Sequence, residues 1–131
     1  MRVLDQYFEA LRTQDWNSLA MCLAEDVHRI GPYRDVVRGK QEYVEFLSKV
    51  IPTLRNYELK VTRVRRLNTD SAVVELSEFA DVDGVRREFP EVLLVDFDKA
   101  GSIVRVDIYM KQQPPRPSLD ASPSTRERPT D

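Results

Sequence analysis

The sequence predicts a single α+β domain in which helices come first and a sheet follows. Two observations carry this prediction. Apolar residues recur at helical spacing through the first part of the chain, and from Tyr57 onward the apolar period changes from about 3.6 residues to about 2. The length of 131 residues suits one domain with its own core and is short for two.

Two helices are expected at the start of the chain. Residues 2–13 carry apolar side chains at the spacing of a helix with one buried face. Asp15 is a residue type that caps helix N-termini, and the stretch from Trp16 to Leu23 repeats the helical pattern. These segments should pack their apolar faces against the sheet.

A short extended piece and a third helix come next. Residues 27–30 run into Gly31-Pro32, which indicates a turn. After Gly39 apolar positions again recur at helical spacing. This helix should end near Pro52, because proline has no backbone N–H to give to a helix interior.

The remainder of the domain should form four strands, at about 57–65, 71–82, 85–97 and 102–111. Asp83-Gly84 separates the second strand from the third. This dipeptide is typical of a two-residue hairpin turn, because both residues tolerate a positive φ.

Two hairpins fix which side chains of the sheet face inward. The first turn pairs Val82 with Val85, and a four-residue loop would pair Phe97 with Ser102. Even-numbered residues of the second strand then lie opposite odd-numbered residues of the third, which lie opposite even-numbered residues of the fourth. All three sets are largely apolar and should form one concave face. The pocket on this face is expected to be lined by Leu76, Leu93, Val95, Val106, Ile108 and Met110.

Three polar residues interrupt this apolar face: Glu78, Arg87 and Glu91. Glu78 should lie opposite Phe89, which makes Arg87 and Glu91 its diagonal neighbours. A carboxyl group inside an apolar face must be paired, protonated or hydrated. Glu78 is therefore the first candidate for acid–base chemistry, with a structural ion pair to Arg87 as the alternative. Glu91 is a candidate to share a proton with Glu78, unless a bulge at Pro90 turns it to solvent.

The order of elements and several short stretches resemble the nuclear transport factor 2-like superfamily, and in particular its SnoaL-like and ketosteroid-isomerase-like domains. Residues 6–15, QYFEALRTQD, resemble the start of those domains, and Leu23-Ala-Glu-Asp26 resembles the end of their second helix. Gly31-Pro32 and residues 100–104 match as well. The resemblance covers residues 1–111. It implies a cone-shaped, curved mixed or antiparallel β-sheet wrapped around three N-terminal helices.

The catalytic groups of these relatives carry over only in part. Tyr7 stands in the place of the isomerase's oxyanion-stabilising tyrosine, but Gly31 replaces the general-base Asp and Leu93 replaces the protonated Asp. The resemblance therefore argues against ketosteroid isomerisation by that route.

A second catalytic pattern of the superfamily is also broken. Limonene-epoxide-hydrolase-like members activate water with an Asp–Arg–Asp trio. Here Glu78 keeps the first carboxylate, whereas Leu76 and Ile108 replace the other two residues. Arg87 could supply a guanidinium on the same concave face, but from a different position than the arginine of the trio.

Five further residues are candidates for the pocket. Tyr7 is the candidate donor to a ligand oxygen, with a core tyrosine whose hydroxyl is hydrated as the alternative. Either His28 or Arg29 should face the pocket, since neighbours in an extended segment alternate. Trp16 and Tyr33 are expected to line or cap it, although plain packing explains them equally well.

Composition argues against several classes of function. The net charge is −2 and basic residues are spread along the chain, so no nucleic-acid partner is expected. No apolar run approaches the roughly 20 residues of a membrane span. The single histidine has no ligand cluster around it, so we expect no metal site. Proton transfer by side chains would need no cofactor. Cys22 is the only cysteine, which fits a reducing, cytoplasmic location.

Two functions fit these residues. One is a cofactor-free enzyme that isomerises, cyclises or hydrates an apolar oxygenated small molecule, with Glu78 as acid or base and Tyr7 as oxyanion donor. The other is a non-catalytic module of the same fold that binds a small molecule or dimerises.

Two expectations concern the outside of the domain. The resemblance implies a homodimer through the outer sheet face that bears Arg105, Asp107 and Tyr109. Residues 112–131 hold five prolines and few apolar side chains, so we expect a disordered tail.

Overall fold

The structure, a computed structural model, describes residues 2–111; the segment 112–131, expected to be a disordered tail, lies outside the described residues. The elements are α1 (Arg2–Thr13), α2 (Trp16–Met21), β1 (Leu23–Ile30), β2 (Val36–Arg38), α3 (Lys40–Val50), a 3₁₀ turn η1 (Ile51–Thr53), β3 (Arg55–Asn68), β4 (Ser71–Val82), β5 (Val85–Phe97) and β6 (Ile103–Met110). The α+β class is thus the one that the sequence predicts.

The helices begin and end where local chemistry places them. The Asp15 side chain caps α2 by accepting a hydrogen bond from the Ser18 backbone N–H at 3.1 Å. The third helix follows Gly39, whose φ of 91° is a conformation that glycine adopts without strain. Pro52 lies in η1 directly after α3, as expected.

The second helix is shorter than the sequence predicts, and the first strand is longer. The stretch Leu23–Asp26, expected to end a helix, forms the start of β1 instead. Leu23 pairs with Ile103 of β6, and both side chains are buried. Burial and pairing at the sheet thus override a helical pattern that was correct up to Met21.

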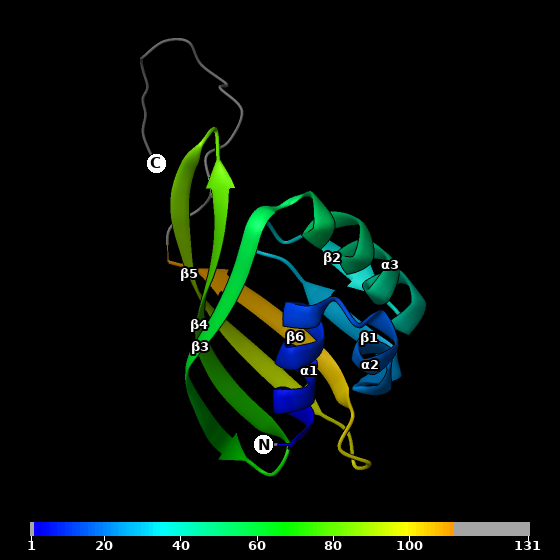
Figure 1. Cartoon of the computed structure of the whole chain (residues 1–131). Coiled ribbons are helices and arrows are strands. Elements are labelled where there is room, and N and C mark those ends of the chain that lie inside the picture. The colour runs from blue at the N-terminus through cyan, green and yellow to red at the C-terminus, as the bar shows by residue number, and fades with distance from the viewer. Residues whose placement is uncertain (1, 112–131) are drawn as a thin grey trace, which may run out of the picture.

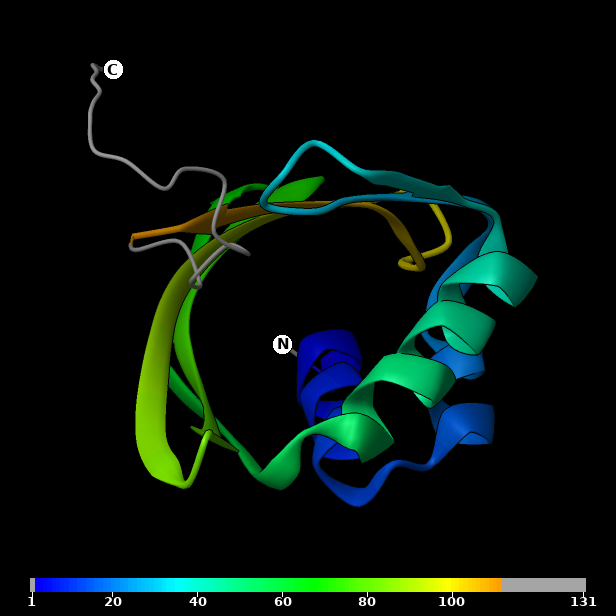
Figure 2. The ribbon, with the colours of Figure 1, turned by 90° about the horizontal axis from the view of Figure 1, so that it is seen from above.

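The strands form one mixed sheet in the order β2-β1-β6-β5-β4-β3. Only β1 and β6 run parallel; the other neighbours are antiparallel. The short strand β2 was not expected (Figure 1). Figure 2 shows the sheet curving around α1, with α2 and α3 on the open side of the curve.

The β4–β5 hairpin matches its prediction. Val82 pairs with Val85, and the register continues without a shift to the other end of both strands. Asp83 and Gly84 have φ values of 53° and 78°, as a type I′ turn requires. Glu78 lies opposite Phe89, and no bulge occurs at Pro90.

The β5–β6 hairpin differs from its prediction by a register shift. Phe97 pairs with Ile103 instead of Ser102, and an irregularity next to it makes Val95 pair with Val106. The net shift is two residues, so the same side of β6 still faces inward. The exception is the start of the strand, where Ile103 is fully buried.

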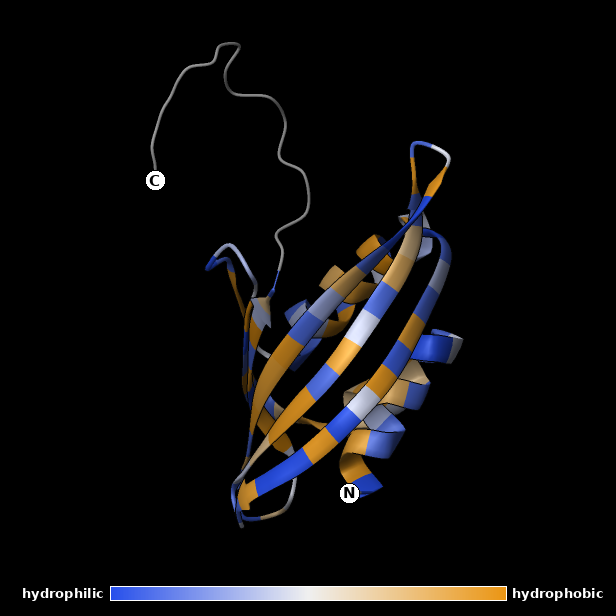
Figure 3. Ribbon diagram, turned by 90° about the vertical axis from the view of Figure 1, so that its left-hand side faces the viewer, coloured by the Kyte–Doolittle hydropathy of each residue, from blue (hydrophilic) through white to orange (hydrophobic). Residues whose placement is uncertain are grey.

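The core lies between α1 and the concave face of the sheet. Its buried cluster includes Leu4 and Phe8 of α1, Val74 of β4, Val95 of β5 and Val106 of β6. Figure 3 shows polar and apolar residues alternating along β3, β4 and β5, the pattern of strands with one buried face. Within residues 2–111, none of the helices has the length and apolar character needed to span a membrane.

Candidate active site

A small cavity lies between the helices and the concave face of the sheet. The space open to the centres of water-sized molecules is about 30 Å³, which is room for about two waters. Its walls are mostly apolar, with polar groups only from Tyr7, Arg29, Glu78 and Glu91. The remaining lining residues are Phe8, Leu11, Leu47, Ile51, Leu59, Leu76, Leu93 and Ile108.

Two carboxyl groups face each other in this cavity. Glu78 pairs with Phe89 and Glu91 pairs with Leu76, so the two glutamates are diagonal neighbours on adjacent strands. They are close enough to share a hydrogen bond when one of them carries a proton. Glu91 is only 5% exposed, and among the described residues nothing hydrogen-bonds its Oε2.

The environment of Glu91 favours its protonated form. Burial raises the pKa of Glu91 far above its ordinary value, and the hydrogen bond and charge of Glu78 raise it further. The positive charge of Arg29 acts in the opposite direction but is the smallest contribution. At neutral pH Glu91 is therefore a carboxylic acid, with an oxygen free to engage a ligand.

A tyrosine holds the other carboxyl group. The Tyr57 hydroxyl donates a hydrogen bond to Glu78 Oε2 at 2.6 Å. Burial, followed by the negative charge of Glu78, raises the pKa of Tyr57, so the phenol keeps its proton and remains a donor. Donation of this kind stabilises a carboxylate. The two glutamates thus have different surroundings.

Sequence reasoning missed Tyr57, although a signal was present. Tyr57, Leu59 and Val61 alternate with polar residues and so mark the inward face of β3. No short turn of known type fixed the register of β3 against β4, and its pairing contains several irregularities. The contact with Glu78 therefore required the structure.

Tyr7 belongs to a buried pair of tyrosines. Its hydroxyl lies 2.5 Å from that of Tyr43, and either oxygen can be the donor. Burial raises the pKa of Tyr7 well above its ordinary value, and the neighbouring Tyr43 adds to the effect. Tyr7 lines the cavity from α1, whereas Tyr43 holds it from α3. Tyr43 is a second residue that sequence reasoning missed.

The structure decides between His28 and Arg29. Arg29 lines the cavity, and its guanidinium lies 4.9 Å from the centre of the Phe46 ring and 4.0 Å from the Asp35 carboxylate. His28, its neighbour in β1, does not line the cavity and lies on the opposite face of the strand.

Several other candidates lie outside the cavity. Arg87 is exposed, and within residues 2–111 no ion pair joins it to Glu78, the alternative role considered for Glu78. Trp16 packs against the core, and Tyr33 is an exposed loop residue.

The six apolar residues expected to line the pocket lie in three different places. Leu76, Leu93 and Ile108 line the cavity. Val95 and Val106 are fully buried in the core, and Met110 lines a surface groove that Ile30, Gly31, Pro32 and Arg34 also line. Among residues 2–111 no group of histidine, cysteine or acidic side chains is arranged to hold a metal ion.

Comparison with known proteins agrees with this architecture. Residues 4–106 match the sequence profile of the SnoaL-like domain. No curated protein matches the chain in sequence. Among solved structures, a putative ketosteroid isomerase from Kribbella flavida has a TM-score of 0.73 at 22% identity, covering 94% of this chain and 89% of that one.

Two Mycobacterium tuberculosis structures are also similar. An epoxide hydrolase that resembles limonene epoxide hydrolase has a TM-score of 0.71 at 17% identity, covering 84% of this chain and 80% of that one. A protein solved in complex with estradiol-17beta-hemisuccinate has a TM-score of 0.69 at 19% identity, covering 82% and 89%. At these identities the likeness shows the fold alone.

Proposed function

The chain belongs to the SnoaL-like family, and on that premise we propose that its cavity is the active site of an acid–base enzyme without a metal. Its substrate would be an apolar oxygenated small molecule. The observation that supports this most is the pair of glutamates, Glu78 and Glu91, in one buried apolar cavity. Two carboxyl groups whose surroundings differ can act as acid and base at the same pH.

The surroundings assign the two roles. Glu91 holds the proton of the pair, and with substrate bound this proton turns from Glu78 to the substrate oxygen and is transferred to it. Glu78, the carboxylate that accepts a hydrogen bond from Tyr57, removes a proton from a substrate carbon or from water. The proton then returns from Glu78 to Glu91 through their hydrogen bond, which restores the starting state. Isomerisation, cyclisation and hydration all fit this exchange.

The rest of the cavity favours an apolar substrate with a polar atom. Leu76, Leu93 and Ile108 offer no hydrogen bonds, so binding would rest on apolar contact, with orientation set by the carboxyl pair and Tyr7. Because the free space holds about two waters, a larger substrate requires the lining side chains to move outward. The estradiol ester bound by a structural neighbour combines an apolar steroid skeleton with oxygen functions at its ends.

Activity of carboxamide variants tests the proposal. The purified chain would be incubated with steroid enones, terpene epoxides and 1,3-diketones, and conversion followed by chromatography. Glu78→Gln and Glu91→Gln should each lower kcat about a hundredfold or more on any substrate converted. Glu88→Gln is the matched control, because Glu88 lies on the outer face of β5 and bonds Ser77 at 2.6 Å. If both cavity variants keep wild-type kcat, the proposal is wrong.

The alternative is a binding module of the same fold. Gly31 favours this alternative, because the isomerases carry their general base at this position. Here a side chain would not fit without a rearrangement, since its Cβ would come within 2.4 Å of the Asp35 carboxylate. Saturable binding of the same compounds, without conversion and unaffected by Glu78→Gln, would support the module.

A further inference from the structure

The start of β3 contains a local irregularity. Arg55 pairs with Asp81 and Glu58 pairs with Phe79, so three steps along β3 match two steps along β4. One extra residue is therefore inserted, which is a β-bulge. Asn56 lies within it and has a φ of 54°, a value that asparagine tolerates better than most residues.

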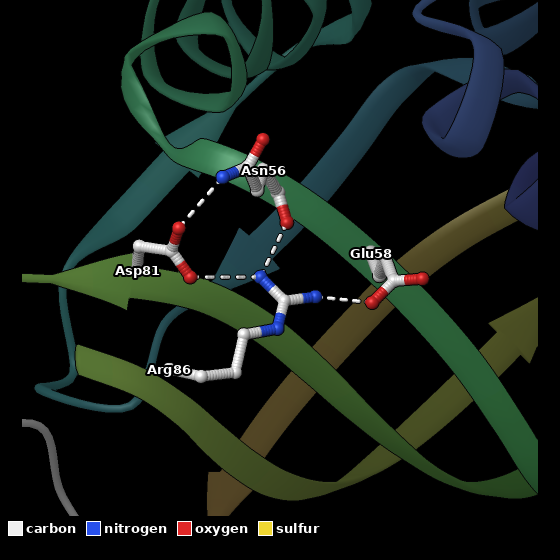
Figure 4. Close-up of polar contacts among 4 residues, drawn as sticks. All are labelled: Asn56, Glu58, Asp81 and Arg86. Atoms are coloured by element: carbon white, nitrogen blue, oxygen red, sulfur yellow. Dashed lines mark hydrogen bonds and ion pairs between the residues drawn. The ribbon is translucent and has the colours of Figure 1, made fainter. Parts of the chain in front are cut away.

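Four side chains hold this bulge from the outer face of the sheet, and we call them the Arg86 clamp: Asn56, Glu58, Asp81 and Arg86 (Figure 4). Arg86 Nη1 donates to the Asn56 carbonyl at 2.6 Å and to Asp81 Oδ1 at 3.2 Å, while Nη2 donates to Glu58. Asn56 Nδ2 donates to Asp81 Oδ2 at 2.6 Å. One guanidinium thus joins three residues on β3 and β4.

The clamp holds the residues on either side of Tyr57. Asn56 and Glu58 are its chain neighbours, and both are bonded to Arg86. Alternation along the strand directs Tyr57 the other way, toward the concave face, where its hydroxyl reaches Glu78. The two chain neighbours of Tyr57 are thus bonded on the outer side of the sheet, while its hydroxyl is bonded on the concave side.

From this arrangement we propose that Arg86 is a positioning residue, which aims Tyr57 at Glu78 by fixing the bulge. With the clamp intact, Tyr57 stabilises the carboxylate of Glu78 and the shared proton stays on Glu91. Without it, the bulge relaxes, the 2.6 Å hydrogen bond lengthens, and the proton is shared more evenly. The catalytic meaning of this step rests on the proposed function, but the step itself is a matter of geometry.

A purely stabilising role explains the clamp less well. Arg86 is 39% exposed and Glu58 is 70% exposed, and exposed ion pairs contribute little to stability. A guanidinium is suited to a different task, because its rigid fork holds several acceptors in fixed relative positions.

Carbon-13 NMR of the side-chain carboxyl groups tests the inference on the full chain near neutral pH. Tyr57→Phe defines the shift of the Glu78 and Glu91 resonances when the hydrogen bond is lost. Arg86→Met should move both resonances in the same direction as Tyr57→Phe does, and by at least half of that shift. Arg63→Met is the matched control: Arg63 pairs with Glu75 on the same two strands, away from the bulge, and its loss should leave both resonances in place.

A second variant covers the case in which Arg86→Met folds poorly. Glu58→Gln keeps Arg86 and removes one charged arm of the clamp, so it should move the resonances in the same direction by a smaller amount. If Tyr57→Phe shifts the resonances and neither clamp variant does, the inference is wrong. It is equally wrong if Tyr57→Phe shifts nothing.

The NMR measurement requires no substrate, so it separates this inference from the proposed function. Shifted resonances in a chain that converts no compound would support the clamp and count against the enzyme. Where a substrate is converted, Arg86→Met should lower kcat several-fold with little change in KM, because Tyr57 acts on Glu78 and not on the ligand.

Discussion

The protonation of Glu91 connects the chemistry of the cavity to the stability of the fold. Its pKa is raised in the folded protein, mainly by burial, whereas in the unfolded chain it returns to about 4.3. At any pH between the pKa of Glu91 in the unfolded chain and its raised pKa in the folded protein, the folded state binds more protons than the unfolded state. The free energy of unfolding should therefore fall as pH rises through this window, by up to about 1.4 kcal/mol per pH unit.

Glu91→Gln should remove this dependence, because a carboxamide does not ionise. Urea denaturation from about pH 5 to about pH 8 should show the variant gaining stability relative to the wild type as pH rises. Glu88→Gln, which removes a carboxyl on the outer face, should follow the wild type. Parallel curves for Glu91→Gln and the wild type would mean that Glu91 is ionised in the fold.

At the scale of elements, what could be predicted depended on the turns. Asp83-Gly84 fixed the β4–β5 register and hence the neighbourhood of Glu78 and Glu91. The 98–101 loop has no such strong signal, and its irregular pairing shifted β6 by two residues. The bulge at Asn56 is specified by contacts with β4 and β5 that are distant in sequence, so the role of Tyr57 was beyond prediction.

The contact between α1 and α3 gives a prediction at the same scale. Tyr7 and Tyr43 are both buried and bond each other, so Tyr7→Phe or Tyr43→Phe alone leaves a buried hydroxyl without its partner. Each single variant should lose about 1 to 3 kcal/mol of stability. The double variant should lose less than the sum, because neither hydroxyl remains. Additive losses in urea denaturation would show that the bond does not couple the two helices.

The whole molecule presents an outer sheet face whose role is open to a direct test. Leu94 of β5 pairs with Asp107 of β6, and on this face Leu94 is 37% exposed and Tyr109 is 57% exposed. Exposed apolar residues on a broad sheet are typical of a surface that another chain covers. We therefore predict a homodimer through this face, which would leave the cavity on the concave side of each subunit free.

Sedimentation velocity at micromolar concentration would measure this assembly. Leu94→Arg and Asp107→Arg place new charges at the centre of the face, so each should shift the wild-type dimer toward monomer. Met21→Arg is the control: Met21 is 75% exposed on α2, away from the sheet face, and its replacement should leave the dimer intact. A wild-type monomer would contradict the prediction, and so would a dimer that both sheet variants leave unchanged.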